Sequence, residues 1–193
     1  MASLAILSRM PKTNSIYTIP TCITKSVSDV ILQELSGSNL EPGTIGKENE
    51  VLNYRKSEVC WITTDHWVSG MMAHFIRCAN TNLYGYDLDN WANFVQYTVY
   101  DKPGSYYDWH NDLAESEFDS NRIRKLSISL CLSSKDEYEG GEFQILTGRQ
   151  MESFKMDTGD AIVFPSDYMH RVRPVKSGKR ISLVGWMGGP PFK

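Results

Sequence analysis

Two stretches in the first half of the chain carry the spacing of amphipathic helices. In residues 27–35, apolar side chains recur every three or four positions, which is helical spacing, and Ser-Gly-Ser at 36–38 ends the pattern. Residues 67–83 repeat this spacing with a wider apolar face. Between them, Glu-Pro-Gly at 41–43 opens a segment to residue 50 that we expect to be a loop. A short strand is expected at 58–62.

From residue 94 the pattern changes to short runs of alternating apolar and polar residues. We expect strands at 94–100, 106–110, 126–132, 142–146, 161–164, 170–175 and 180–186. Turn-forming residues separate several of these runs, and Ser-Gly-Lys at 177–179 predicts a hairpin between the last two. Such a series is typical of a sandwich or barrel. The predicted fold is α+β, mainly β: a double-stranded β-helix (jelly-roll) core with N-terminal supporting helices.

Composition is that of an ordinary globular protein. The 193 residues are 41% apolar and 22% charged, which is enough apolar material for one substantial core. We therefore expect a single domain over residues 1–193, with a helical N-terminal part to about residue 90 and the jelly-roll core at about 91–187. A net charge of −3 provides no basic surface for a phosphate backbone, so nucleic acid is not an expected partner.

The cysteines and the absence of a long apolar run indicate the compartment. The four cysteines form no CxxC pair, and we expect free thiols rather than disulfides. The N-terminus lacks basic residues ahead of its short apolar run, which argues against a signal peptide. No stretch reaches the roughly 20 apolar residues of a membrane span. The prediction is a cytoplasmic protein with no membrane partner, and the sequence indicates no oligomeric state.

Two of the four histidines form a pattern with an aspartate. His110 and Asp112 lie two residues apart at the end of a predicted strand, so their side chains share one face. His170 begins another predicted strand. Two histidines and one carboxylate with an open opposite face suit a non-haem Fe(II) oxygenase. An isolated His-x-Asp pair is common and more often an ordinary surface or turn feature. For the other two histidines a structural role is expected, because His66 lies in a connection and His74 lies beside an apolar helical stripe.

Arg180 strengthens this interpretation. It begins the last predicted strand, ten residues after His170, on the face that also carries Ser182, Val184 and Trp186. A cation on a half-buried strand is costly unless it is paired. A guanidinium binds a carboxylate in bidentate fashion, so a dicarboxylate cosubstrate is one candidate partner. A carboxylate of the chain itself is the other, and both remain open at this point.

Several motifs together resemble a known family. HND at 110–112, EYEGGEF at 137–143, GDAIVFPSDYMHRVRPVKSGKR at 159–180 and the closing Trp186 are similar, in this order, to the 2-oxoglutarate/Fe(II) dioxygenases of the prolyl 4-hydroxylase type. The likeness runs from about Arg55 to Trp186. It implies that His110, Asp112 and His170 are the iron ligands.

The resemblance also implies a site for the cosubstrate. Arg180 would hold the distal carboxylate of 2-oxoglutarate, and Ser127 falls where a small hydroxyl residue assists it. A tyrosine upstream of the first ligand adds a third contact in the family. Tyr100 is the choice here, although it lies one residue further from His110 than is usual, so Tyr97 remains an alternative.

A third set of residues implies a peptide substrate. Arg55, Ser57 and Trp61 reproduce the R-x-S-x-x-x-W spacing of relatives that hydroxylate peptidyl proline. Tyr107, Arg124 and Trp186 match other positions that line the proline pocket there. Aromatic walls suit a pyrrolidine ring, although a place in the jelly-roll core is the alternative for both tryptophans.

The implied function is that of a 2-oxoglutarate- and Fe(II)-dependent dioxygenase, similar to procollagen-proline 4-dioxygenase. It would hydroxylate a prolyl residue in a peptide or protein, consume O2, and release succinate and CO2, with L-ascorbate as a further candidate cofactor. The same chemistry on a free amino acid or another side chain is one alternative. A non-catalytic jelly-roll metal-binding or sensor protein is the other, and Arg180 weighs against it.

Overall fold

The structure is a computed structural model that describes residues 15–43 and 54–192. Its helical elements are α1 (Lys25–Leu35), α2 (Trp67–Ala79) and the π-helical turn η2 (Asn80–Tyr84). Its strands are β1 (Tyr17–Ile19), β2 (Glu41–Pro42), β3 (Arg55–Lys56), β4 (Glu58–Ile62), β5 (Val95–Tyr100), β6 (Ser105–His110), β7 (Ile123–Cys131), β8 (Tyr138–Gly140), β9 (Phe143–Thr147), β10 (Gln150–Phe154), β11 (Ala161–Pro165), β12 (His170–Gly178) and β13 (Arg180–Gly189).

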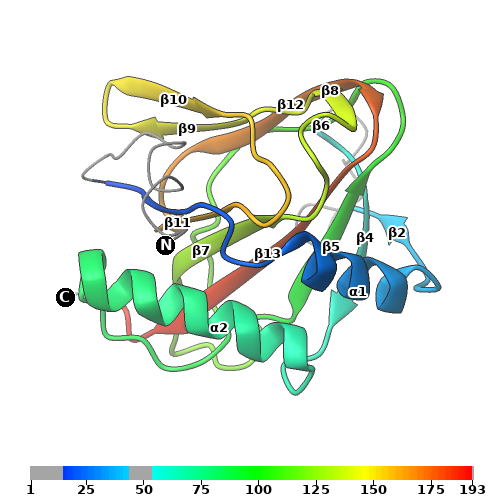
Figure 1. Cartoon of the computed structure of the whole chain (residues 1–193). Coiled ribbons are helices and arrows are strands. Elements are labelled where there is room, and N and C mark those ends of the chain that lie inside the picture. Colours follow the sequence, from blue (N-terminus) through cyan, green and yellow to red (C-terminus); the bar gives the residue numbers. More distant parts are fainter. Residues whose placement is uncertain (1–14, 44–53, 193) are drawn as a thin grey trace, which may run out of the picture.

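Two antiparallel sheets face each other in a mainly β jelly roll (Figure 1). One sheet has the strand order β1-β11-β7-β13-β5-β4-β2. The other has the order β10-β9-β12-β6-β3, with β8 also paired to β12. The predicted fold class is confirmed. Strands from the first third of the chain take part in both sheets, because β1 pairs with β11, β4 with β5 and β3 with β6.

The helices lie over the outer face of the seven-stranded sheet, with α2 running across it in Figure 1. Their apolar faces, including Ile31, Met72 and Ile76, join one core cluster with side chains from β5, β7 and β13. The helix starts are capped by side chains. Thr24 accepts a hydrogen bond from the N–H of Val27, and His66 accepts one from Val68. The structural role expected for His66 is therefore confirmed.

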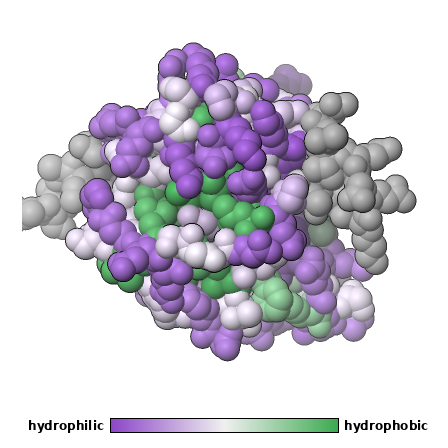
Figure 2. Space-filling view, turned by 90° about the vertical axis from the view of Figure 1, so that its right-hand side faces the viewer, coloured by the Kyte–Doolittle hydropathy of each residue, from purple (hydrophilic) through white to green (hydrophobic). Residues whose placement is uncertain are grey.

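A second cluster fills part of the space between the two sheets. It joins Tyr100, Cys131 and Ile162 of the seven-stranded sheet to Phe143 and Val172 of the other. Successive strand residues point to opposite faces, so one strand can supply both clusters. On the face drawn in Figure 2, apolar side chains gather in a central hollow surrounded by hydrophilic ones. Among the described residues, no helix has the length and apolarity needed to cross a bilayer.

Most predicted elements are present with shifts of a few residues. The predicted helices at 27–35 and 67–83 correspond to α1 and to α2 with η2, and each predicted strand has its counterpart. The segment predicted as a loop from 41 to 50 begins with strand β2, and its residues 44–50 lie outside the described residues. Strands β1, β3, β8 and β10 were missed because they are short or lack a clear apolar alternation. The single-domain prediction stays a prediction.

The hairpin predicted at 177–179 is wrong. β12 and β13 are consecutive, but they pair in different sheets: β12 with β6, β8 and β9, and β13 with β5 and β7. Gly178 marks the point where the chain crosses from one sheet to the other. Its φ is +76°, and a Cβ there would lie 2.0 Å from the carbonyl oxygen of Glu137. The turn residues were recognised correctly, but local sequence does not say which sheet the next strand joins.

Gly178→Ala should therefore destabilise the protein more than Gly148→Ala, a substitution at another glycine with positive φ. Gly148 also has a positive φ, +66°, but nothing lies within 4 Å of its ideal Cβ. We expect Gly148→Ala to lower the free energy of unfolding by about 1–2 kcal/mol, the usual cost of a left-handed L-residue. Gly178→Ala should lower it by at least about 3 kcal/mol, since backbone must also move. Urea unfolding measures both, and equal losses would contradict the close approach to Glu137.

Candidate active site

A cavity of about 460 Å³ opens between the two sheets. Its walls come from β5, β7 and β13 of one sheet, from β6, β9 and β12 of the other, and from residues 111–117 that follow β6. All candidate site residues predicted from the sequence line this cavity except Ser57, Ser127 and the alternative Tyr97. The fold thus collects residues from positions 55 to 186 around one space.

The two candidate histidine ligands are paired across strands. His110 ends β6 and His170 begins β12, and they are direct partners in the antiparallel ladder. Asp112 follows two residues after His110. Its carboxylate oxygens lie 3.8 Å from Nε2 of His110 and 3.4 Å from Nε2 of His170. One ligand atom from each of the three residues falls within 4.8 Å of the others, so together they could hold one metal ion.

Backbone carbonyls orient both imidazoles. Nδ1 of His110 lies 2.7 Å from the carbonyl oxygen of Asp108, and Nδ1 of His170 lies 2.9 Å from that of Tyr168. A carbonyl oxygen only accepts, so each Nδ1 carries the proton. Each Nε2 is then left with a lone pair directed toward Asp112, which is how metal-binding histidines are commonly held.

Burial sets the charge of this cluster. Desolvation, followed by the neighbouring His170, lowers the pKa of His110 to about 3. The imidazole is therefore neutral at neutral pH, as a metal ligand must be. Burial by itself would raise the pKa of Asp112, but the two histidines, the indole of Trp186 and a hydrogen bond from Ser127 outweigh it and hold that pKa below its ordinary value. The set offers two imidazole nitrogens and one carboxylate.

The role predicted for Ser127 at the distal carboxylate of the cosubstrate is wrong. Its hydroxyl donates to Asp112 at 2.8 Å and lies 3.0 Å from the hydroxyl of Ser166. Ser127 pairs with Trp186, six residues along β13 from Arg180. Six strand residues span about 20 Å. Ser127 lies on the same face of β7 as Ser129, which lines the cavity, but its position along that face depends on the strand register.

Arg180 lies at the other end of the cavity and is 1% exposed. One guanidinium nitrogen donates to the hydroxyl of Ser182 at 3.1 Å, while Nε is buried without a hydrogen-bond partner. Over the described ranges, 15–43 and 54–192, no carboxylate forms an ion pair with Arg180. Of the two partners left open by the sequence, the internal salt bridge is therefore absent there. A buried, unpaired guanidinium at the wall of a cavity favours an anionic ligand.

Strand β5 separates the two tyrosine alternatives. Gln96, Thr98 and Tyr100 line the cavity, whereas Tyr97 points to the opposite face and packs in the cluster under the helices. The guanidinium of Arg180 lies 5.5 Å from the centroid of the Tyr100 ring. Tyr100 is thus the tyrosine positioned to reach a ligand of Arg180.

The residues predicted to bind a peptide form a stack that reaches the metal cluster. Tyr107 stacks on His110 with a centroid distance of 3.5 Å, and the guanidinium of Arg55 lies 4.5 Å above Tyr107. Ser57 does not line the cavity. It accepts a hydrogen bond from Nε of Arg55 at 2.7 Å and so positions that side chain.

Two tryptophans and an arginine form the opposite side of the mouth. The rings of Trp61 and Trp186 are tilted with centroids 6.3 Å apart, and the guanidinium of Arg124 lies 4.4 Å above Trp186. Trp61 is 47% exposed, so it is not a core residue, whereas Trp186 is 6% exposed.

Sequence reasoning missed three polar residues of the cavity. Gln96 accepts a hydrogen bond from Arg55 at 2.8 Å and one from Thr98 at 3.1 Å, and Ser129 lines the same wall. The alternation of residues 94–100 contained the signal, since it places polar Gln96 and Thr98 on one face of a strand.

The fold and this site define a class of protein. A jelly roll with two histidines and one carboxylate at one end of a cavity, and a buried cation at the other, has the donor set of a non-haem iron oxygenase that takes an anionic cosubstrate. Two imidazoles and one carboxylate suit Fe(II), and the unpaired guanidinium suits a carboxylate. The residues present therefore fit both groups.

Comparison with known proteins agrees with this class. Residues 95–188, just under half of the chain, match the family model of the 2OG-Fe(II) oxygenase superfamily. The fold of the chain is that of several solved prolyl hydroxylases. A prolyl hydroxylase from Trichoplax adhaerens, solved with a hypoxia inducible factor peptide fragment, matches with a TM-score of 0.74 at 18% identity, over 91% of this chain and 84% of that one. A Pseudomonas putida prolyl-4-hydroxylase matches with a TM-score of 0.67 at 19% identity, over 93% and 95%.

Curated relatives match over a shorter segment. A PKHD-type hydroxylase of Synechococcus sp. (strain CC9605) is 40% identical over 85 residues, which are 44% of this chain and 37% of that protein. A PKHD-type hydroxylase of Hyphomonas neptunium is 40% identical over 85 residues, 44% and 38% of the two chains. The match thus spans little more than a third of the length of these relatives.

Asp112→Asn should weaken metal binding strongly, because it replaces the anionic ligand by a neutral one of the same shape. We expect the affinity for Fe(II), or for Mn(II) as an oxygen-stable substitute, to fall by more than about a hundredfold, beyond the 10–100-fold typical of outer-shell changes. Asp101→Asn, on an exposed turn, is the matched control. Calorimetric titration of the metal-free proteins measures this, and unchanged affinity in Asp112→Asn would exclude Asp112 as a ligand.

Proposed function

We propose that this chain is a 2-oxoglutarate- and Fe(II)-dependent dioxygenase that hydroxylates a prolyl residue in a peptide or protein and releases succinate and CO2. The observation that carries the proposal is Arg180: a buried guanidinium without an ion-pair partner among the described residues, in the same cavity as two histidines and an aspartate. A protein that only bound metal would gain nothing from this cation.

His110, Asp112 and His170 would hold the iron through Nε2, a carboxylate oxygen and Nε2. Bound iron supplies the activation of dioxygen and the oxidation of an unreactive C–H bond, which amino-acid side chains do not perform. The residues around it keep the ligands in place. Ser127 donates to the carboxylate of Asp112, and the carbonyls of Asp108 and Tyr168 hold the imidazoles in one tautomer.

Arg180 would bind the distal carboxylate of 2-oxoglutarate. The hydroxyl of Ser182 already accepts from its guanidinium, which limits the rotation of the side chain and leaves other N–H groups available. The neighbouring Tyr100 lines the same wall and offers a hydroxyl donor. These residues orient the cosubstrate with its other end toward the metal ligands.

The other side of the cavity would take the prolyl residue. Tyr107, Trp61 and Trp186 supply apolar ring faces, and Arg55 and Arg124 stack on two of them. A pyrrolidine ring has apolar faces and no backbone N–H, so such a slot can accept it without leaving a donor unpaired. The likeness to prolyl hydroxylases, one of them solved with a peptide fragment, supports a peptide over a free amino acid.

Cofactor and compartment complete the proposal. Dioxygen is the co-reactant, and L-ascorbate remains a candidate cofactor. Cys22, Cys60, Cys78 and Cys131 are all free thiols, which supports a reducing compartment such as the cytoplasm.

Hydroxyproline formation coupled to succinate release tests the function. A proline-containing peptide library is incubated with Fe(II), 2-oxoglutarate and O2, and a mass increase of one oxygen on proline is expected. Trp61→Ala should lower peptide hydroxylation by at least about tenfold while peptide-independent decarboxylation of 2-oxoglutarate survives. Trp67→Ala, which removes an equally exposed tryptophan at 44% exposure, is the control. Succinate release without any hydroxyproline would exclude a prolyl substrate.

Arg180→Ala should raise the KM for 2-oxoglutarate by about ten- to a hundredfold, since a charge-assisted hydrogen bond contributes roughly 1.5–3 kcal/mol. Arg180→Lys should recover part of this loss, because it keeps the charge and loses the planar fork. Arg149→Ala, an exposed arginine, should leave KM unchanged. Steady-state kinetics with varied 2-oxoglutarate give these values. An unchanged KM in Arg180→Ala would mean that another residue binds the cosubstrate.

A further inference from the structure

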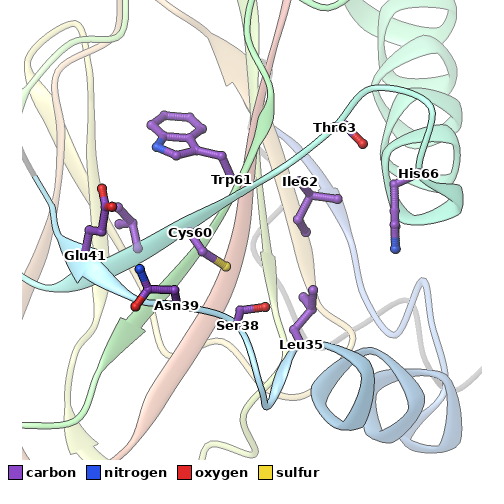
Figure 3. A pocket seen from close by; sticks show the side chains of 10 residues that line it. Leu35, Ser38, Asn39, Glu41, Cys60, Trp61, Ile62, Thr63 and His66 are labelled. Atoms are coloured by element: carbon purple, nitrogen blue, oxygen red, sulfur yellow. The ribbon is translucent and has the colours of Figure 1, made fainter.

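A second cavity, of about 510 Å³, lies along the outer edge of β4. The connection between α1 and β2 supplies Leu35, Ser38 and Asn39, and the facing wall is formed by residues 59–63. Figure 3 shows Cys60 and Ile62 directed toward Ser38 and Leu35, with the ring of Trp61 on the other side of the strand. Trp61 lines this edge cavity and the candidate active site alike, so the two spaces share a wall.

Within the described residues, the main chain of β4 has no strand partner at this edge beyond β2. β2 pairs with β4 only through Glu41 and Pro42, opposite Val59 and Glu58. The N–H of Gly43 donates to the carbonyl of Ser57 at 2.9 Å, so Ser57 directs its main-chain groups toward β2. In an antiparallel ladder, the N–H and C=O groups of every second residue point to the same neighbouring strand. The main-chain groups of residues 59 and 61 therefore point to the same side as those of Ser57.

Trp61 therefore directs its N–H and C=O outward, into the edge cavity. The position opposite it would be Asn39, which lies in the connection from α1 two residues before β2 begins, and in the described chain no backbone hydrogen bond joins Asn39 to Trp61. An open strand edge of this kind is a template for another extended chain.

The lining of the edge cavity is part apolar and part polar. Leu35, Val59 and Ile62 are apolar, whereas Ser38, Asn39 and Thr63 are polar and carry no charge. Burial raises the pKa of Cys60, so its thiol is neutral as well. Glu41 and His66 lie at the two ends of the edge cavity. Nε2 of His66 already lies 3.0 Å from Glu34.

We propose that the edge cavity binds an extended segment of the peptide substrate flanking the hydroxylated proline, with one apolar side chain seated between α1 and β4. The inference rests on the function proposed above and adds a sequence requirement to it. The segment pairs with the main chain of Trp61 as an added strand, a common mode of peptide recognition in which backbone bonds give affinity and a pocket gives specificity. Because Trp61 lines both spaces, the edge cavity lies next to the slot for the proline.

Filling the edge cavity should separate this binding site from the active site. Asn39→Trp places a large ring in it, and Gln33→Trp puts the same ring on the exposed face of α1 as a control. Both proteins and the wild type are given a peptide library with one central proline and six randomised residues on each side. Hydroxylated products are sequenced by mass spectrometry.

We expect an apolar residue at one fixed distance from hydroxyproline in products of the wild type and Gln33→Trp. Asn39→Trp should lose this preference, with KM for a selected peptide raised about tenfold and kcat nearly unchanged. A shortened peptide without the flanking segment should be turned over equally by all three proteins. Methylating one peptide nitrogen in that segment should raise the wild-type KM about three- to tenfold, the effect of one lost hydrogen bond.

The failures are distinguishable. If hydroxyproline forms without any positional preference, or if Asn39→Trp keeps the preference, the edge cavity does not bind substrate while the proposed function stands. If no peptide is hydroxylated by any of the proteins, the proposed function is wrong and this inference is overturned with it.

Discussion

The antiparallel register between β6 and β12 is the constraint on which the candidate site depends. It makes His110 and His170 direct partners, and Asp112 follows within two residues. A slip of one residue between the two strands would turn one imidazole to the opposite face and leave the other without its partner. The register is held by what lies next to it. β12 also pairs with β9, and the rings of Phe143 and Phe164 pack around His170.

The cavity carries opposite charges at its two ends, and both are costly in the absence of ligands. Asp112 and Arg180 are each less than a tenth exposed, so neither is well hydrated. A metal ion compensates the first and a carboxylate the second. A cosubstrate that coordinates the metal and also reaches the guanidinium would relieve both costs at once. Ligands bound by the folded state alone also stabilise it, so part of the stability of the working protein comes from its site.

The sequence predicted much of this arrangement because much of it is local. The period-two pattern of residues 94–100 contains the information that Tyr100 and Tyr97 face opposite sides, and the spacing of His110 and Asp112 places them on one face. The predictions that were wrong concern contacts between residues far apart in the sequence. The resemblance placed Ser127 near Arg180, and nothing in its own strand reports the register with β13 that separates the two. The hairpin at 177–179 failed for the same reason, since a turn sequence does not specify that the chain changes sheets. The edge cavity depends on where β2 begins and ends relative to β4, and the two-residue strand β2 is too short to be recognised from the sequence.

The two faces of strand β5 should differ in how well they tolerate amino-acid substitution. Its odd-numbered residues, such as Val95 and Val99, pack under the helices, where apolar side chains of similar volume exchange at small cost. Its even-numbered residues, Gln96, Thr98 and Tyr100, face the cavity and bind or flank two arginines. Mutational tolerance should therefore alternate residue by residue along a single strand. A laboratory selection for thermostability could repack one side of β5 while the chemistry on the other side stays unchanged.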